Sequence, residues 1–436
     1  MISNLLAARL LISVSLAFHI MFAVFGMVMP LFMAISEGLW LKTKKDVYLL
    51  LAKRWAKGTA VMFAIGAVSG TIVSFELGLL WPKFMAFAGP IIGMPFSLEG
   101  FAFFLEAIFL GIYLYGWKKV SPAIHLASGI IVFICAMMSG VFIVTVNGWM
   151  NTPSGFTLID GVVTHIDPFA AMWNPSAFTE ILHMLIAAIA ALAFAVAGIH
   201  AYKMRNDPKN LFHRKAFAIV VIIAWIASIL QVISGDMSGK HVAQTQPIKF
   251  AALEGHFKTE HGAPLNIFGI PDEKNGVTRF AIRIPYGLSL LAYNHLDAEV
   301  KGLNDFPQDE RPPVAITHIA FQLMILLGFF MFGVSLIGLM MLIRFKRIPD
   351  NPWYLRLMVW TTPMGFIALQ AGWVVTEVGR QPWIIQKIMR TRDAVTTMPG
   401  LAIPLIAFTL LYIFLSVVVF YILRKQVSES PQVINE

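Results

Sequence analysis

The sequence predicts an all-α integral membrane protein, a bundle of about nine transmembrane helices. Two observations carry this prediction. Hydrophobic residues make up 58% of the 436 residues, charged residues make up only 13%, and the mean hydropathy is +0.74. Soluble domains carry about 25% charged residues. The apolar residues also gather in runs that reach the roughly 20 residues of helix needed to cross a bilayer.

Nine apolar runs are long enough to cross the membrane as helices. The first run follows only one basic residue, Arg9, and no small-residue cleavage site follows it. We therefore expect a retained helix there and not a signal peptide. The predicted spans cover residues 10–35, 55–78, 96–117, 123–147, 177–202, 215–235, 314–343, 355–380 and 399–423.

The Lys and Arg residues between the runs predict the orientation of the bundle. Groups of them follow the first, third, fifth, seventh and ninth spans, whereas residues 148–176 contain none. Cytoplasmic loops are enriched in Lys and Arg, so the N-terminus is predicted outside and the C-terminus in the cytoplasm. Residues 384–397 count against this, because they place Lys387, Arg390 and Arg392 on the outer side. The net charge of +9 is attributed to the cytoplasmic loops and not to nucleic-acid binding.

The chain divides into four predicted regions. Residues 1–235 contain the first six spans, residues 236–313 form one large polar segment on the outer side, and residues 314–427 contain the last three spans. Residues 428–436 are predicted to be a disordered tail. The single cysteine, Cys135, excludes an intrachain disulfide and a four-cysteine iron–sulfur cluster, and we expect it to be a small buried apolar residue.

Charged residues lie near the end of the eighth predicted span. A charge within a membrane helix costs about 3 kcal/mol and indicates pairing or function. Glu377 and Arg380 are three residues apart and Trp373 lies four residues before Glu377, so all three share one helix face. Pro382 is predicted to end the helix, because the residue before a proline resists the α conformation. On its own, Arg380 could be an ordinary snorkelling residue at a helix end.

Three residues in apolar runs belong to types that ligate haem iron. His19 lies in the first span and His183 in the fifth, and imidazole is a common haem ligand. Met324 lies in the seventh span, and a His–Met pair ligates the haem of some cytochromes. The chain has 23 Met, most of which are expected to fill the core, so the residues alone do not select Met324.

Glu99 and Glu106 lie in the third span. Seven residues of helix turn through about 700°, which places both carboxylates on one face, two turns apart. Such a pair could relay protons into a buried site, or could be a structural pair that is hydrogen-bonded to neighbouring helices. Ser139 and Asn147, in the fourth span, could each be a helix-packing residue when taken alone.

The run Gly-Arg-Gln-Pro-Trp at residues 379–383 resembles the signature of subunit I of the cytochrome bd quinol oxidases. Other positions similar to the family's motifs begin at about His19 and follow in the same order. The resemblance implies a terminal quinol:oxygen oxidoreductase that oxidises quinol at the outer face and reduces O2 to water through three haems. It also implies a proton gradient generated without pumping, and a place in a bacterial or archaeal cytoplasmic (inner) membrane.

The resemblance implies which residues hold the haems. His183 and Met324 would be the axial ligands of haem b558. His19 would ligate one of the two high-spin haems, which are haem b595 and haem d, or a further haem b in place of haem d. Glu377 would be a ligand or a close partner of a high-spin haem, and which of the two His19 holds stays open.

The resemblance also implies catalytic roles and a proton route. Arg380 and Trp373 would steady haem propionates or carry electrons, and Glu99 would lie beside the high-spin haems. Glu106, with Ser139 and Asn147, would belong to the route for protons.

The outer polar segment would bind the quinol. Lys249 and Glu254 lie there beside apolar residues, and Glu254 would accept a proton when the quinol is oxidised. Without the family, a solvated surface pair would be the simpler interpretation. The loop resembles the short form of the family's quinol-binding loop, and the residues do not distinguish ubiquinol from menaquinol.

The implied partners are a homologous subunit II, quinol, O2 and membrane lipids, with no nucleic acid. The resemblance also allows a small single-span subunit. Gln322 stands where some relatives carry an arginine near the low-spin haem, and the loss of that charge would tend to lower the potential of the haem.

Other classes of membrane protein fit the sequence less well. A haem–copper oxidase needs an adjacent histidine pair, which the chain lacks, and a bc-type cytochrome b needs two spaced pairs, whereas His183 and His200 stand alone. The remaining alternative is a haem-free transporter with Glu99, Glu106 and Glu377 as ion or proton sites.

Overall fold

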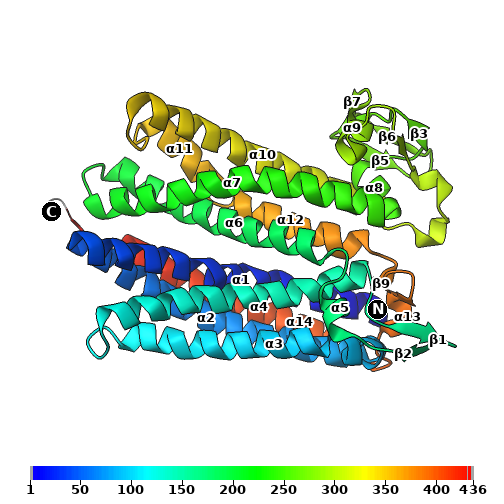
Figure 1. Ribbon diagram of the computed structural model, residues 1–436, viewed down its shortest axis with the longest axis horizontal. Helices are drawn as coiled ribbons and strands as arrows, with labels where there is room; N and C mark the ends of the chain where they lie inside the picture. Colours follow the sequence, from blue (N-terminus) through cyan, green and yellow to red (C-terminus); the bar gives the residue numbers. More distant parts are fainter. Residues whose placement is uncertain (1–2, 430, 434–436) are drawn as a thin grey trace.

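Long helices run side by side along the length of the molecule in the computed structural model, which describes residues 3–429 and 431–433 (Figure 1). Within these residues nine helical segments are long and apolar enough to cross a membrane, which confirms the nine predicted spans. They are α1 (Asn4–Thr43), α2 (Asp46–Leu80), α3 (Pro82–Tyr115), α4 (Pro122–Asn151), α6 (Ala177–Asn206), α7 (Leu211–Thr245), α10 (Val314–Phe345), α11 (Pro352–Thr361) with α12 (Met364–Gly379), and α14 (Ala402–Ser428).

The helices extend beyond the apolar runs that predicted them. One of these extensions moves a predicted boundary: α7 continues through residues 236–245, so the outer polar segment begins at Gln246 and not at Asp236. Gln246 precedes Pro247 and leaves the helical conformation, at φ −135° and ψ 59°, as expected for a residue before proline. The eighth span is broken between α11 and α12 at Pro363, because proline lacks the N–H that an uninterrupted helix needs.

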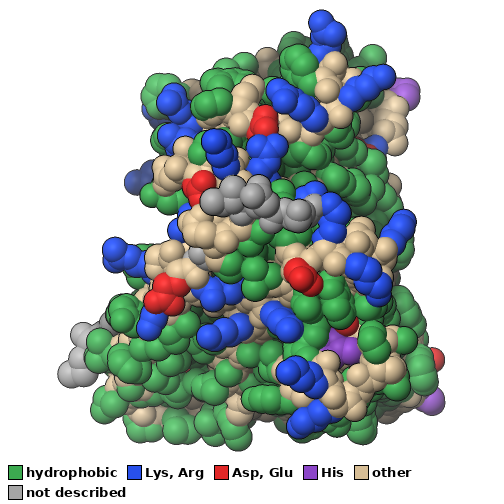
Figure 2. Space-filling model, turned by 90° about the vertical axis from the view of Figure 1, so that its left-hand side faces the viewer, with side chains coloured by type: hydrophobic (Ala, Val, Ile, Leu, Met, Phe, Trp, Pro, Cys, Tyr) green, Lys and Arg blue, Asp and Glu red, His purple; other side chains and the backbone are tan. Residues whose placement is uncertain are grey.

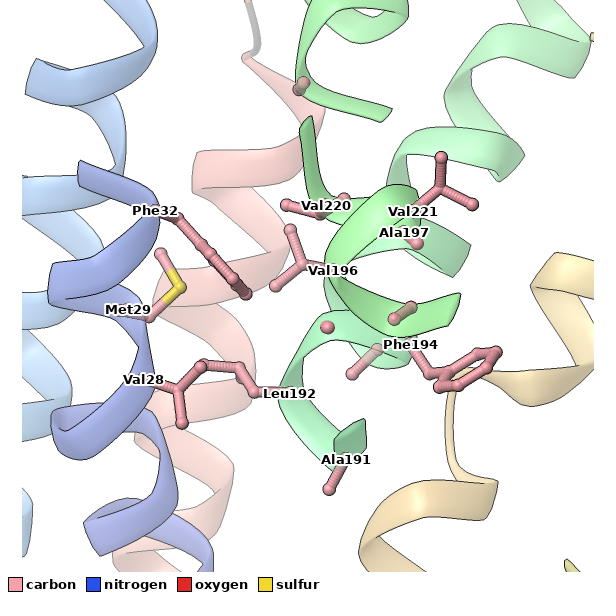
Figure 3. Close-up of a cluster of buried hydrophobic side chains, with 14 of the residues drawn as sticks. Val28, Met29, Phe32, Ala191, Leu192, Phe194, Val196, Ala197, Val220 and Val221 are labelled. Carbon is pink, nitrogen blue, oxygen red and sulfur yellow. The ribbon is translucent and has the colours of Figure 1, made fainter. Parts of the chain in front are cut away.

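Two groups of helices form the bundle (Figure 1). One contains α1–α4 and α14, and the other contains α6, α7, α10, α11 and α12. Figure 3 shows the apolar core that joins them, with Val28 and Phe32 of α1 facing Leu192 and Val196 of α6. Within the second group α6 and α12 approach closely at Gly365, where an added Cβ atom would lie 2.5 Å from Ala191 Cα. Small residues at such crossings allow membrane helices to pack backbone against backbone.

The outer polar segment is folded and contains short helices, turns and strands. It begins with α8 (Pro247–Glu254), which ends at Gly255 with a positive φ of 58°, a conformation that favours glycine. Three short antiparallel strand pairs and α9 (Gly287–Tyr293) follow, then two 3₁₀ turns, η1 (Leu303–Asp305) and η2 (Gln308–Glu310). The strand pairs are β3 (Glu260–His261) with β8 (Glu299–Val300), β4 (Leu265–Ile267) with β7 (Ile282–Ile284), and β5 (Ile270–Asp272) with β6 (Val277–Arg279).

Smaller elements cover the same end of the bundle as α8 and α9, near the N-terminus (Figure 1). They are the pair β1 (Thr157–Ile159) and β2 (Val162–Thr164), α5 (Pro168–Met172), the pair β9 (Trp383–Ile385) and β10 (Met389–Arg390), and α13 (Thr391–Ala394). This end carries the polar segments that the sequence predicts on the outer side.

The opposite end carries the C-terminus and is rich in Lys and Arg (Figure 2). The chain end packs there, because Leu211 N donates a hydrogen bond to Val433 O at 2.7 Å and Asn210 Nδ2 donates one to Pro431 O at 3.1 Å. Residues 431–433 are therefore held by the bundle. Residues 430 and 434–436 of the predicted disordered tail lie outside the described residues.

Candidate functional site

His183 lies in the second turn of α6 and faces α7. Its Nδ1 is 3.1 Å from Ser234 Oγ, and the Ser234 hydroxyl itself donates to Gln231 O at 3.1 Å. The hydroxyl proton is thus used on the carbonyl, so the imidazole donates from Nδ1 and keeps its lone pair on Nε2. The side-chain nitrogen of Gln231, Nε2, lies 3.0 Å from Nε2 of His183. Gln231 Oε1 is buried without a hydrogen-bond partner among the described residues.

Met324 lies on α10, which packs against α7 and α12, the two helices that also pack against α6. Its thioether fits against Gly372 of α12, where an added Cβ atom would lie 3.1 Å from Met324 Sδ. Met324 thus lies against α12 and His183 against α7, and both of these helices pack against α6 and α10. The described residues contain no direct hydrogen bond between the two.

His19 lies on α1 and faces α2 in the same manner. Its Nδ1 is 3.0 Å from Ser69 Oγ, and that hydroxyl donates to Ile65 O at 2.8 Å. Again Nδ1 is the donor and Nε2 keeps the lone pair that a metal would need. The ring is accommodated by Gly70, where an added Cβ atom would lie only 2.9 Å from His19 Cε1.

Glu377 and Arg380 form an ion pair at the end of α12, with 2.5 Å between Arg380 Nη2 and Glu377 Oε2. The side chain of Arg380 is 1% exposed and that of Glu377 is 33% exposed. The prediction that they share a helix face is confirmed. Asn147 Nδ2 of α4 donates a hydrogen bond to the other carboxylate oxygen of Glu377. Trp373 lies one turn earlier on α12 and is partly buried against the core, away from these hydrogen bonds.

Lys249 of α8 reaches the same place from the outer segment. Its Nζ is 3.4 Å from Asn151 Oδ1 and 3.4 Å from Thr376 O. Arg380 Nη1 also lies 3.4 Å from Asn151 Oδ1, and Asn151 Nδ2 donates to Glu180 Oε1 at 2.9 Å. We call Lys249, Arg380, Glu377, Glu180 and Asn151 the charged cluster. Burial lowers the pKa of Lys249 to about 8, and the carboxylates of Glu180 and Glu377 oppose this lowering.

Glu254 lies on another face of α8, since five residues of helix turn through about 500°. Lys249 and Glu254 are 6% and 5% exposed, so the alternative of a solvated surface pair is wrong. Burial raises the pKa of Glu254 to about 8, and its Oε2 has no hydrogen-bond partner among the described residues. No hydrogen bond or ion pair within the described chain joins the two side chains.

Glu99 and Glu106 lie two turns apart on the continuous helix α3, as the spacing predicts. Ser139 Oγ of α4 donates to Glu99 Oε1 at 3.3 Å. Glu106 is 6% exposed and lies against α1, where a Cβ atom added to Gly26 would be 3.7 Å from Glu106 Oε1. The structure therefore places Ser139 beside Glu99. Asn147 lies elsewhere on α4, at the end of the helix that contacts the charged cluster.

Gln322 connects α10 to the outer segment. Gln322 Nε2 donates to Asn266 O at 3.2 Å, and Phe268 N donates to Gln322 Oε1 at 3.1 Å. Both hydrogen-bonding groups of the amide are thus satisfied by the backbone at and next to β4, two residues before Met324.

Sequence reasoning missed Asn151 and Glu180, which complete the charged cluster, and Thr376, whose hydroxyl accepts a hydrogen bond from Asn151 Nδ2. A signal for them was present, because Asn151 lies four residues after Asn147 and Glu180 lies three residues before His183. Polar residues on the same helix face as a predicted site are candidates for that site. Thr376, whose hydroxyl donates to Asn147 Oδ1 at 3.1 Å, carries no such signal, because threonine is common in membrane helices.

The donor types and the space around them fit haem. Imidazole, thioether and carboxylate groups are spread over separate helices, and no group of three or more His, Cys, Asp or Glu within the described residues could hold a bare metal ion. A haem iron needs only one or two protein ligands, because the macrocycle supplies the rest. The buried Arg380 Nε and Trp383 Nε1 have no hydrogen-bond partner among the described residues, and such donors suit propionate groups.

An apolar groove of about 630 Å³ lies between α1, α10 and α12. Leu323, beside Met324, and Gln370 are among the residues that line it. Gln370 Nε2 donates to Ala17 O at 2.7 Å, two residues before His19. The groove joins the helices of two predicted ligands and is of the size that proteins use for cofactors.

The fold and the site together define a multi-pass membrane protein whose helices carry His, Met and Glu side chains of the types that ligate haem iron. The family model for cytochrome bd terminal oxidase subunit I matches residues 7–431. The chain belongs to this family, as the sequence resemblance predicts, and the family implies haem cofactors. The alternative of a haem-free transporter is not supported.

Individual relatives cover nearly the whole chain. The putative cytochrome bd menaquinol oxidase subunit I of Bacillus subtilis (strain 168) is 38% identical over 98% of this chain and 97% of its own length. The cytochrome bd ubiquinol oxidase subunit 1 of the same organism is 32% identical over 99% of this chain and 95% of its own. The solved structure of bd oxidase from Geobacillus thermodenitrificans matches with a TM-score of 0.92 and 40% identity, over 98% of this chain and 99% of the other.

Proposed function

We propose that the chain is the haem-bearing subunit of a respiratory terminal oxidase that oxidises quinol at its outer end and reduces O2 to water. One observation carries this proposal. Lys249, from the polar outer segment, hydrogen-bonds within the same cluster as the Glu377–Arg380 pair of α12. A side chain of the quinol-binding segment thus lies beside residues suited to the oxygen-reducing centre, as electron transfer between the two would require.

Four residues would hold three haems. His183 and Met324 would ligate haem b558 through Nε2 and Sδ, and Gln231, whose Nε2 lies 3.0 Å from His183 Nε2, would give way to the haem iron. His19 and Glu377 would serve the high-spin haems, b595 and d, or a further haem b in place of haem d. Bound haem would supply the electron transfer and the oxygen chemistry. The hydroxyls of Ser69 and Ser234 would fix the two imidazole rings.

Quinol oxidation releases two protons, and Glu254 would receive one of them. Because burial raises its pKa to about 8, its carboxylate takes up a proton near neutral pH more readily than an exposed glutamate does. Its position on α8, at the end of the molecule with the strand pairs, favours proton release on that side (Figure 1). Lys249 would hold the neighbouring part of the quinol site.

Protons for water formation would enter from the opposite side. Glu106 and Glu99 would form the route, with Ser139 orienting the carboxylate of Glu99. Asn147 would fix Glu377 at the end of this route. Arg380 would balance the charge of Glu377 and contact a propionate. Trp373 would be a further aromatic group beside the site. Opposite sides for proton release and uptake would give a proton gradient without pumping.

The basic end of the molecule would face the cytoplasm (Figure 2). It carries the connections between α1 and α2, α3 and α4, α6 and α7, and α10 and α11, so the N-terminus would lie outside and the C-terminus inside a bacterial or archaeal cytoplasmic (inner) membrane. Exposed apolar side chains such as Phe101 and Phe104 of α3 and Phe420 of α14 would face lipid or a partner. The partners would be subunit II and, in addition, a small single-span subunit.

Oxygen uptake by the purified complex tests the proposal. Wild-type complex should consume O2 with a short-chain quinol, and His183→Ala should abolish uptake together with the low-spin haem signal. The matched control is His295→Ala, in the exposed outer segment, which should leave both unchanged. Oxygen uptake that does not depend on added quinol would overturn the assignment. So would a His183→Ala complex that keeps its full low-spin haem signal.

A further inference from the structure

The charged cluster is electrically balanced. Two cations, Lys249 and Arg380, meet two anions, Glu377 and Glu180, around the amide of Asn151. Lys249 and Arg380 are 6% and 2% exposed, so water does little to screen them. A buried charge without a partner is strongly unfavourable, whereas a balanced set is tolerated. The equal number of positive and negative charges therefore stabilises this part of the fold.

Asn151 connects the two halves of the cluster. Its Oδ1 accepts hydrogen bonds from Lys249 Nζ and from Arg380 Nη1, each at 3.4 Å. Both lone pairs of this oxygen therefore face cations. Its Nδ2 donates to Glu180 Oε1 at 2.9 Å. The amide dipole therefore points its oxygen at two positive charges and its nitrogen at a negative one, the orientation that this arrangement of charges favours.

Glu180 lies at the point where the cluster meets a haem ligand. It occupies the first turn of α6, where the helix dipole stabilises a carboxylate. His183 is three residues further along the same helix, so the two side chains share a face. Arg380 is already paired with Glu377 at 2.5 Å, which leaves the ammonium of Lys249 for Glu180 to balance.

Resting on the function proposed above, we propose that Glu180 is a positioning residue for electron entry. Through Asn151 it balances the ammonium of Lys249 and so sets the electrostatic potential at the haem held by His183. Reduction adds one negative charge to a haem. An unbalanced cation nearby therefore favours the reduced form and raises the midpoint potential, and an unbalanced anion lowers it.

A double-mutant cycle with the midpoint potential as its readout tests this. In Glu180→Gln the potential of the low-spin haem should rise on the acid side of neutrality, where Lys249 keeps its proton. In Lys249→Met the potential should fall at pH values below about 8, where the wild-type ammonium keeps its proton and its removal leaves the charge of Glu180 unbalanced. The double variant should return towards the wild-type value, because both charges are gone. Glu180→Asp keeps the charge and should restore most of the wild-type potential.

The matched control is Glu273→Gln, an equal loss of charge in the exposed turn between β5 and β6, which should leave the potential unchanged. Two single variants that shift the potential in the same direction, or not at all, would overturn the inference. So would a double variant whose potential lies further from the wild-type value than that of either single variant. If one of these outcomes is found while the wild-type complex binds three haems and oxidises quinol, only this inference fails and the proposed function stands. Wild-type complex without haem would instead refute the proposed function.

Discussion

Gly70 offers the sharpest test of the His19 site. An alanine there would place Cβ 2.9 Å from His19 Cε1, closer than two carbon atoms approach without strain. The imidazole cannot simply withdraw, because its Nδ1 is fixed by Ser69 Oγ at 3.0 Å. Overpacking of this kind costs about 1–3 kcal/mol, so we expect Gly70→Ala to lower thermal stability and to displace the ring from the haem that we propose it ligates.

Gly78 on the same helix provides the matched control. A Cβ atom added there meets nothing within 4 Å, so Gly78→Ala should gain roughly 1 kcal/mol from helix propensity alone. The two variants differ only in what the new methyl group touches. The assay is the absorption spectrum of the purified complex together with its melting temperature. A Gly70→Ala complex with full high-spin haem content and a melting temperature equal to that of Gly78→Ala would refute the reasoning.

Three further predictions concern the other parts of the site. Arg380→Gln leaves Glu377 without its cation and should cost about 3 kcal/mol, together with loss of high-spin haem signal in the spectrum. Glu254→Gln should change how stability depends on pH. The pKa of Glu254 rises from 4.5 to about 8 on folding, so its contribution is fully present below pH 4.5 and is lost as pH rises through 8, and the variant should lack this decline in melting experiments. Ser139→Ala removes the donor to Glu99 and should slow oxygen uptake roughly fivefold, equivalent to about 1 kcal/mol, with an unchanged KM for quinol.

Exposed residues of the same types serve as controls. Arg392→Gln and Ser97→Ala should leave stability, haem content and turnover at wild-type values. Equal effects of Arg380→Gln and Arg392→Gln would contradict the buried ion pair. A decline in stability towards pH 8 that survives in Glu254→Gln would assign that decline to another group. A raised KM in Ser139→Ala would move this residue from the proton route to quinol binding.

The fold was largely predictable because apolar length is a direct measure of what a bilayer requires. The nine spans were found, but not their ends, since α7 continues through polar residues until Pro247. The helix there no longer needs an apolar surface, so hydropathy carries no signal. The strand pairs of the outer segment were missed for a related reason. Strands of two or three residues are too short to show alternation in the sequence.

The sequence predicted individual residues of the candidate site, but not the contacts between residues that lie on different helices. The spacing of Glu377 and Arg380 fixed their ion pair, because both lie on one helix. The arrival of Lys249 at that pair depends on how α8 folds back onto the bundle, which no local pattern encodes. Buried pairs between helices were likewise invisible. His125 Nδ1 lies 2.8 Å from Glu37 Oε1, and Ser15 Oγ donates to Glu76 Oε1 at 2.7 Å, although each pair is distant in sequence.

The most direct test of the central claim is a reduced-minus-oxidised absorption spectrum of the purified complex, combined with haem extraction. The account predicts three haems per copy of the chain, with b-type bands that include one lost selectively in His183→Ala. A red chlorin band would identify haem d at the oxygen site, and b-type bands alone would identify a further haem b in its place. A complex that contains no haem would contradict the account.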